Sequence, residues 1–193
     1  QPYWVYLPPE YSPRRRYPLV IFLHGYDPAI SKIAPWLPDE SMQRLAAARD
    51  FILAVPYGRR NSDFVNIGED DTLAVTDEVL AHYSADPQRV FLLGVSMGGY
   101  GAYTVGLHHP QRWAGVAVLC GRTDFYLWFQ LERAALPAWK RILYDADDPR
   151  HLARNASHLP FFIQHGTLDS IVPVEHSRRF VADLKRLGGI VRY

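Results

Sequence analysis

Short, nearly continuous apolar runs alternate along the chain with segments in which apolar residues recur at helical spacing. Such runs are typical of parallel strands covered on both faces, because neither face of these strands meets water. An outer antiparallel strand is expected at residues 3–7, where flanking prolines suit a sheet edge. The pattern predicts an α/β fold with a mostly parallel sheet flanked by helices on both faces. The expected parallel strands are residues 19–23, 51–55, 90–93, 116–119 and 161–164.

Four helices are predicted between these strands. Asp39 can cap the first, and Asp71 or Thr72 can start the second. The third begins directly after Ser96, and the fourth covers about residues 175–187, before a Gly-Gly stop. The inner faces of the first two helices are expected to carry Met42, Leu45 and Ala46, and Val75, Val79 and Leu80, respectively.

The length of 193 residues fits a single domain spanning residues 1–193. Residues 125–149 are rich in aromatic side chains and interrupt the alternation, which predicts an insertion above the sheet edge. The formal net charge of +1 gives no reason to expect nucleic acid or an acidic membrane surface as a partner. No apolar stretch approaches the ~20 residues that span a bilayer. The lone Cys120 excludes an intrachain disulfide.

A G-x-S-x-G motif at residues 94–98 follows the apolar run 90–93 and precedes a Gly- and Ala-rich helix start. This strand–turn–helix context is the one that a serine nucleophile of this type requires. The turn forces Ser96 into a strained backbone conformation and exposes its hydroxyl at the carboxyl edge of the sheet. Side chains at Gly94 and Gly98 would collide in so tight a turn. We therefore identify Ser96 as the candidate nucleophile.

The strand at residues 19–23 ends in His24-Gly25-Tyr26. In this architecture, one oxyanion donor is the backbone N–H after the nucleophile, here that of Met97. The second donor comes from the loop after the earlier strand, and by position it is the N–H of Tyr26. Gly25 lets the backbone approach the substrate, and His24 is expected to brace the loop rather than to transfer protons.

Asp169 is the favoured triad acid, because it follows the strand at residues 161–164. An aspartate there can lie beside the serine loop and orient an imidazole, in the chain order serine, acid, histidine. The rival is Asp124, on the loop after the preceding strand. Gly166 and the Val-Pro at residues 172–173 favour Asp169, because they shape a compact loop at the right edge.

The catalytic histidine is expected after one further strand. Residues 189–193 have the pattern of that strand, and the sequence stops inside it. His176 falls at the start of the intervening helix, a poor position from which to reach Ser96, and His165 is expected to support the site. We therefore expect the base, a final strand and a helix to lie outside these residues. The strand edge left open would favour self-association.

Taken together, these motifs resemble those of bacterial esterases and single-domain relatives of prolyl oligopeptidase, within the α/β-hydrolase superfamily. The resemblance implies a Ser–His–Asp hydrolase of small-molecule esters, or less often of peptides, that uses no metal and no cofactor. It also implies Ser96 as nucleophile, Asp169 as acid, and Tyr26 and Met97 as oxyanion donors. The matching segments are 17–25 (YPLVIFLHG), 68–71 (GEDD), 86–90 (DPQRV), 94–101 (GVSMGGYG) and 165–173 (HGTLDSIVP).

Three functions remain open on the sequence: an esterase acting through an acyl-enzyme, a peptidase on the same scaffold, and a non-catalytic hydrolase-like domain that binds a ligand. Only the lack of a well-positioned histidine supports the last. Several aromatic residues either line an acyl pocket or pack within the fold, and the sequence leaves both interpretations open. They are Trp36, Tyr57, Tyr100, Phe125, Tyr126, Trp128 and Phe129.

Overall fold

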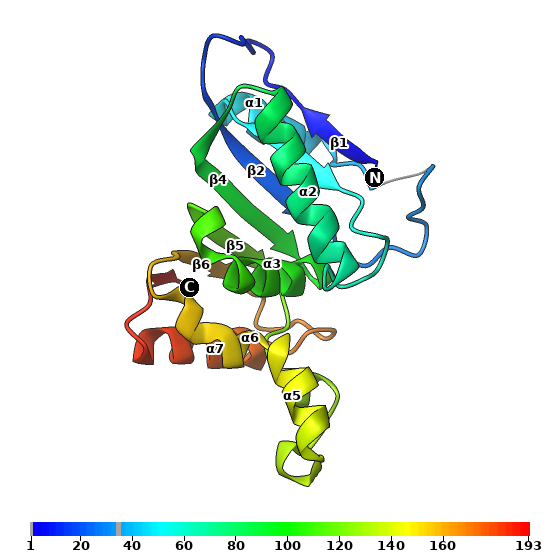
Figure 1. Ribbon diagram of the computed structural model, residues 1–193, viewed down its shortest axis with the longest axis vertical. Helices are drawn as coiled ribbons and strands as arrows, with labels where there is room; N and C mark the ends of the chain where they lie inside the picture. Colours follow the sequence, from blue (N-terminus) through cyan, green and yellow to red (C-terminus); the bar gives the residue numbers. More distant parts are fainter. Residues whose placement is uncertain (1, 34–35) are drawn as a thin grey trace.

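The computed structural model describes residues 2–33 and 36–193, which form a seven-stranded sheet (Figure 1). The strand order is β1-β3-β2-β4-β5-β6-β7. β1 pairs antiparallel with β3, and every other pair is parallel, so the predicted sheet and its antiparallel edge strand are confirmed. The strands are β1 Tyr3–Tyr6, β2 Tyr17–Leu23, β3 Ile52–Pro56, β4 Ala85–Val95, β5 Gly115–Leu119, β6 Phe161–Gln164 and β7 Val191–Arg192.

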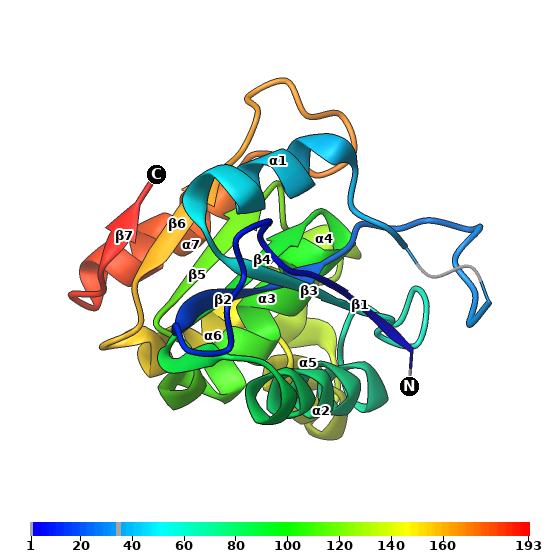
Figure 2. The same ribbon diagram turned by 90° about the horizontal axis from the view of Figure 1, so that it is seen from above.

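Helices lie on both faces of the sheet, with α1 on one side and α2 and α3 on the other (Figure 2). The main core lies on the second face, where Val79 of α2, Tyr103 of α3 and Phe180 of α7 are fully buried. No helix in the described part of the chain is long and apolar enough to cross a bilayer. The α-helices are α1 Glu40–Arg49, α2 Ile67–His82, α3 Met97–His108, α4 Phe125–Trp128, α5 Ala138–Ala146, α6 Pro149–Leu152 and α7 Glu175–Arg186.

The face that carries α1 is covered unevenly. Ala46 of α1 packs in a small cluster with Phe22 and Leu53, on β2 and β3. Further along the same face, Phe91 on β4 is 37% exposed and Phe162 on β6 is 41% exposed. They line an apolar groove of about 570 Å³ that extends to β7, the edge strand.

Three details of the sequence prediction are wrong. α2 begins at Ile67, after Asn66, and not at Asp71 or Thr72. Asp71 is buried instead, and its carboxylate accepts a hydrogen bond from the N–H of Gly58 at 2.9 Å, because a turn beside the core needs that acceptor. Leu45 is 53% exposed, since α1 turns only Ala46 fully inward. β4 is also longer than expected and starts at residue 85.

A carboxylate and two histidines join α2, α3 and α5. Glu69 of α2 accepts hydrogen bonds from His108 at 3.0 Å and from His109 at 2.7 Å. The other ring nitrogen of His108 lies 3.0 Å from the carbonyl oxygen of Ala146, at the end of α5. The hydrogen bond with Glu69 raises the pKa of His108 to about 9, against the opposing effect of burial. His108 is therefore protonated at neutral pH, and its positive charge compensates the buried carboxylate.

We predict that Glu69→Gln destabilises the fold in a pH-dependent way. Because the folded pKa of His108 is raised, its contribution is fully present below its unfolded pKa of about 6.5 and is lost as pH rises to about 9. The variant should lose about 2 kcal/mol of unfolding free energy at pH 6 and much less at pH 9.5. Urea denaturation at both pH values measures this difference.

The matched control for this prediction is Glu78→Gln. Glu78 faces His82 on the same helix at 3.4 Å, but both side chains are more than half exposed, at 52% and 63%. Exposed pairs contribute little to stability, so this variant should match the wild type at both pH values. An equal loss from Glu69→Gln at pH 6 and pH 9.5 would show that the charge of His108 does not matter.

Candidate active site

Ser96 lies at the junction of β4 and α3, in a positive-φ backbone conformation with φ 55° and ψ −115°. This is the strained strand-to-helix turn that the motif predicts. The N–H of Ser96 donates to the carbonyl of Leu119 on the neighbouring strand β5 at 2.9 Å. Ser96 is half-buried and lines a cavity of about 520 Å³ at the carboxyl edge of the sheet.

The two motif glycines are required because the turn is packed against backbone. A Cβ atom on Gly94 would lie 1.9 Å from the carbonyl oxygen of Gly98. A Cβ atom on Gly98 would lie 2.0 Å from the carbonyl oxygen of Leu23, the last residue of β2. The predicted collision is therefore confirmed, and at Gly98 it involves a different strand. This contact sets the position of Ser96 relative to the loop after β2.

The loop after β2 lies beside the nucleophile. A Cβ atom on Gly25 would be 3.7 Å from the Cβ of Ser96, so the two backbones are in close approach. Tyr26 is 68% exposed and lines the same cavity as Ser96 and Met97. Met97 is the first residue of α3, so no carbonyl of a preceding helical turn accepts a hydrogen bond from its N–H. The structure thus brings together the two segments expected to supply oxyanion donors.

His24 is fully buried behind this loop rather than facing the cavity. Its Nδ1 lies 2.8 Å from the carbonyl oxygen of Gly25, and its Nε2 lies 3.4 Å from that of Tyr57. Its ring makes an edge contact with that of Phe64. Burial lowers the pKa of His24, so the ring is neutral at pH 7. These contacts fit a residue that braces the loop.

Asp169 lies in the turn after β6. Its carboxylate accepts hydrogen bonds from the N–H groups of Val172 and Ile171, both at 2.9 Å, and these hold its pKa below its usual value. The charge of Asp169 influences the pKa of the Cys120 thiol. Burial raises the pKa of this thiol, a hydrogen bond with the Ser96 backbone opposes the rise, and the charge of Asp169 adds to it.

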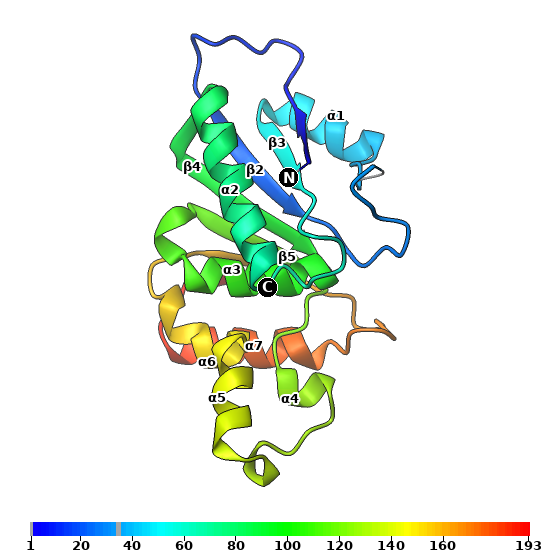
Figure 3. The same ribbon diagram turned by 45° about the vertical axis from the view of Figure 1, so that its right-hand side comes forward.

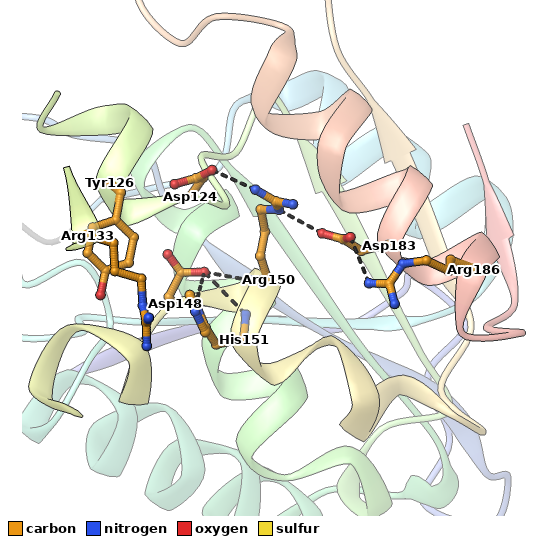
Figure 4. A pocket seen from close by; sticks show the side chains of 8 residues that line it. All are labelled: Asp124, Tyr126, Arg133, Asp148, Arg150, His151, Asp183 and Arg186. Carbon is orange, nitrogen blue, oxygen red and sulfur yellow. Dashed lines mark hydrogen bonds and ion pairs between the residues drawn. The ribbon is translucent and has the colours of Figure 1, made fainter. Parts of the chain in front are cut away.

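The carboxylate of Asp124 belongs to a separate charged cluster (Figure 4). It caps α4 through the N–H of Leu127 and pairs with Arg150 at 2.8 Å and Arg179 at 3.2 Å. Arg150 also pairs with Asp183 of α7 at 2.7 Å. This cluster lines its own cavity of about 360 Å³. Asp124 therefore joins α4, α6 and α7. The helices α4 and α5 lie at the end of the molecule opposite α1 (Figure 3).

Neither histidine near the predicted acid hydrogen-bonds to Ser96. The Nδ1 of His165 lies 2.7 Å from the hydroxyl of Ser177, and its Nε2 lies 2.8 Å from the carbonyl oxygen of Val172 and 3.4 Å from Asp169. The Nδ1 of His176 accepts from the N–H groups of residues 123 and 124, and burial lowers its pKa to about 4. None of the eight histidines, all in the described part of the chain, hydrogen-bonds to Ser96.

Three polar residues of the cavity wall are not among the residues predicted from sequence: Asn61, Asp63 and Arg122. Each follows the carboxyl end of a parallel strand, β3 or β5, and the meeting of these ends at one sheet edge is the signal that could have found them. Of the seven aromatic residues considered as pocket lining, only Trp128 lines this cavity. Others pack elsewhere, as Trp36 does against Phe22 at 5.0 Å between ring centroids.

A sequence model of the prolyl oligopeptidase family matches residues 66–193 of this chain. The chain belongs to the prolyl oligopeptidase family. The matched region includes the serine turn and the Asp169 loop, while the loop after β2 precedes it. Membership agrees with the resemblance drawn from the sequence motifs.

Individual relatives are similar over most of this chain. Dipeptidyl-peptidase 5 of Porphyromonas gingivalis is 24% identical over 191 residues, which cover 86% of this chain and 28% of that protein. A thermostable esterase structure is 25% identical, has a TM-score of 0.69, and is matched over 99% of this chain and 49% of its own. An acylaminoacyl peptidase structure of Pyrococcus horikoshii is 20% identical and has a TM-score of 0.75. It is matched over 98% of this chain and 33% of its own. The chain therefore spans less than half of each relative, and the α/β-hydrolase fold is shared.

We predict that Gly98→Ala severely destabilises this family member. Its new methyl group would meet the backbone of β2, which cannot move aside like a flexible side chain. We expect a loss of about 3 kcal/mol or more of unfolding free energy, measured by urea denaturation. Gly166→Ala is the matched control, because a Cβ atom there meets nothing within 4 Å. Equal stabilities of the two variants would contradict the packing argument.

Proposed function

We propose that the protein hydrolyses carboxylic esters through an acyl-enzyme formed on Ser96. The observation that carries this proposal is the strained Ser96 turn, which opens onto a cavity shared with Tyr26 and Met97. A backbone strained in this way persists only where its surroundings enforce it, and such sites cluster where function needs them. Membership of the prolyl oligopeptidase family supports a serine hydrolase.

In the proposed reaction, the Ser96 hydroxyl oxygen attacks the ester carbonyl carbon and its proton passes to a histidine base. The N–H groups of Met97 and Tyr26 stabilise the oxyanion, aided by the positive end of the α3 dipole. The bond to the alcohol then breaks, and the alcohol leaves with that proton. Water attacks the acyl-enzyme, releases the carboxylic acid and restores the serine hydroxyl.

Asp169 is proposed as the acid that orients the base. The N–H groups of Val172 and Ile171 keep its carboxylate ionised at neutral pH, as this role requires. Asp124 is less suited, because Arg150 and Arg179 already engage its carboxylate. We assign the base to none of the eight histidines of residues 1–193, because none of them hydrogen-bonds to Ser96 in the described part of the chain.

A peptidase is the second candidate function. The observation that favours it is that two of the relatives are peptidases, one a dipeptidyl-peptidase and the other an acylaminoacyl peptidase. Amide and ester hydrolysis use the same nucleophile and oxyanion donors, so the candidate site suits both. The esterase is preferred because the thermostable esterase is the compared structure with the higher sequence identity, at 25%.

The test is turnover of p-nitrophenyl esters beside aminoacyl and prolyl anilides. We expect the product of the complete gene to hydrolyse the esters at an ordinary enzyme rate, and Ser96→Ala to abolish that activity. Asp169→Asn should lower kcat by about 10⁴-fold, because a misoriented imidazole cannot take the serine proton. Residues 1–193 alone should reach only about 10³–10⁴-fold over water, through binding and oxyanion stabilisation.

Each alternative has a distinct outcome. Cleavage of anilides in preference to esters would identify a peptidase. Turnover of neither substrate by the complete gene product would favour the non-catalytic binder. Ordinary ester turnover by residues 1–193, lost in Ser96→Ala, would mean that the base is a histidine of this segment. His165→Gln and His176→Gln would then show which one.

A further inference from the structure

Arg122 places a cation in the wall of the cavity that contains Ser96. Its side chain is only 13% exposed, and its guanidinium lies 4.1 Å from the ring centroid of Tyr100 and 5.4 Å from that of Trp128. Two aromatic rings therefore confine a mostly buried cation in the wall of the cavity that Ser96 also lines. Such contacts hold the guanidinium plane in place but supply no hydrogen-bond acceptor in that plane.

The backbone beneath Arg122 is rigidly placed. Cys120 has a left-handed conformation with φ 46°, and its N–H donates to the carbonyl of Gln164 on β6 at 2.9 Å. Gly121 packs on the first turn of α3, where a Cβ atom would lie 2.7 Å from the carbonyl carbon of Gly99. The turn that carries Arg122 is thus packed against the helix that begins at Ser96.

The guanidinium of Arg122 has more donors than acceptors. A guanidinium carries five N–H donors. Nη2 donates to the carboxylate of Asp63 at 2.7 Å. Nε is buried without a hydrogen-bond partner among the described residues. Asp63 is itself 37% exposed and lines the same cavity. A confined guanidinium with an unused N–H group can donate hydrogen bonds to an acceptor group of a ligand.

We propose that Arg122 determines substrate specificity by binding a carboxylate carried on the acyl group of the ester. This inference rests on the proposed function, because it uses Ser96 as the point of attack. The substrate class is the monoester of a short dicarboxylic acid, whose ester carbonyl lies at Ser96 while its free carboxylate pairs with Arg122. A cavity of about 520 Å³ accommodates an acyl group of this size.

The charges of the wall explain why a carboxylate fits better than a hydrocarbon chain. A hydrocarbon acyl group would shield Arg122 from water and supply no acceptor, which costs free energy. A carboxylate supplies charge-assisted hydrogen bonds to the guanidinium. Asp63 opposes this binding, because it already pairs with Arg122 and repels a second anion. Neutralising Asp63 should therefore strengthen carboxylate binding, an effect that a purely structural Arg122 would not produce.

The first experiment measures binding by isothermal titration calorimetry in the Ser96→Ala chain, so that turnover does not consume the ligand. The probes are monomethyl succinate, which carries one carboxylate, and dimethyl succinate, its uncharged analogue. We expect the anion to bind about 10–100-fold more tightly. Arg122→Met should abolish that preference, Arg122→Lys should retain part of it, and Asp63→Asn should increase it. Circular dichroism verifies folding. If Arg122→Met does not fold, Arg122→Lys and Asp63→Asn decide the question.

The second experiment compares kcat/KM for p-nitrophenyl hemisuccinate and p-nitrophenyl pentanoate in the complete gene product. We expect Arg122→Met to lower the hemisuccinate value about 10–100-fold relative to the pentanoate value. If ester turnover depends on Ser96 but Arg122→Met leaves the ratio of the two kcat/KM values unchanged, the inference is overturned and the proposed function stands. Arg122-dependent binding of monomethyl succinate without Ser96-dependent turnover would overturn the proposed function and leave Arg122 as an anion site.

Discussion

The contact between Gly98 and the end of β2 is the constraint on which the rest of the site depends. Because the first turn of α3 lies directly against the carbonyl oxygen of Leu23, the helix, the strand and the following loop share one geometry. This contact keeps Ser96 in its strained conformation and holds the Tyr26 loop beside it. The cavity wall after β5 packs on the same helix turn through Gly121. Backbone packing, more than any side-chain contact, assembles this edge.

Buried charges organise the part of the molecule beyond α3. Glu69 is compensated by His108 and hydrogen-bonded by His109, and Asp124 is compensated by Arg150 and Arg179. A buried carboxylate is tolerated only when such partners offset its lost hydration. Both clusters connect the segment between β5 and β6 to the core. The same requirement separates the two candidate acids, because Asp124 is engaged in structure whereas Asp169 lies in an outer turn held by backbone N–H groups.

The scaffold and the proposed specificity come from different kinds of residue. The serine turn and its glycines match the motifs of the prolyl oligopeptidase family, whose relatives in the comparison include an esterase and two peptidases. Arg122 and Asp63 line the cavity from loops after β5 and β3, outside the strands of the sheet. A cation held between Tyr100 and Trp128 gives this cavity a chemistry that its hydrolase fold does not dictate.

The sequence by itself determined the sheet, its antiparallel edge strand, the helix after Ser96 and the tight turn, because these follow from local apolar patterning and from steric rules for glycine. It misjudged the start of α2, because Asp71 satisfies a distant N–H instead of capping a helix. Only the tertiary structure decided that Arg122, Asp63 and Trp128 line the same cavity as Ser96, that Asp124 belongs to another cluster, and that no histidine of the described residues hydrogen-bonds to the serine. These facts depend on residues far apart in sequence, and local propensity does not determine which loops meet at one sheet edge.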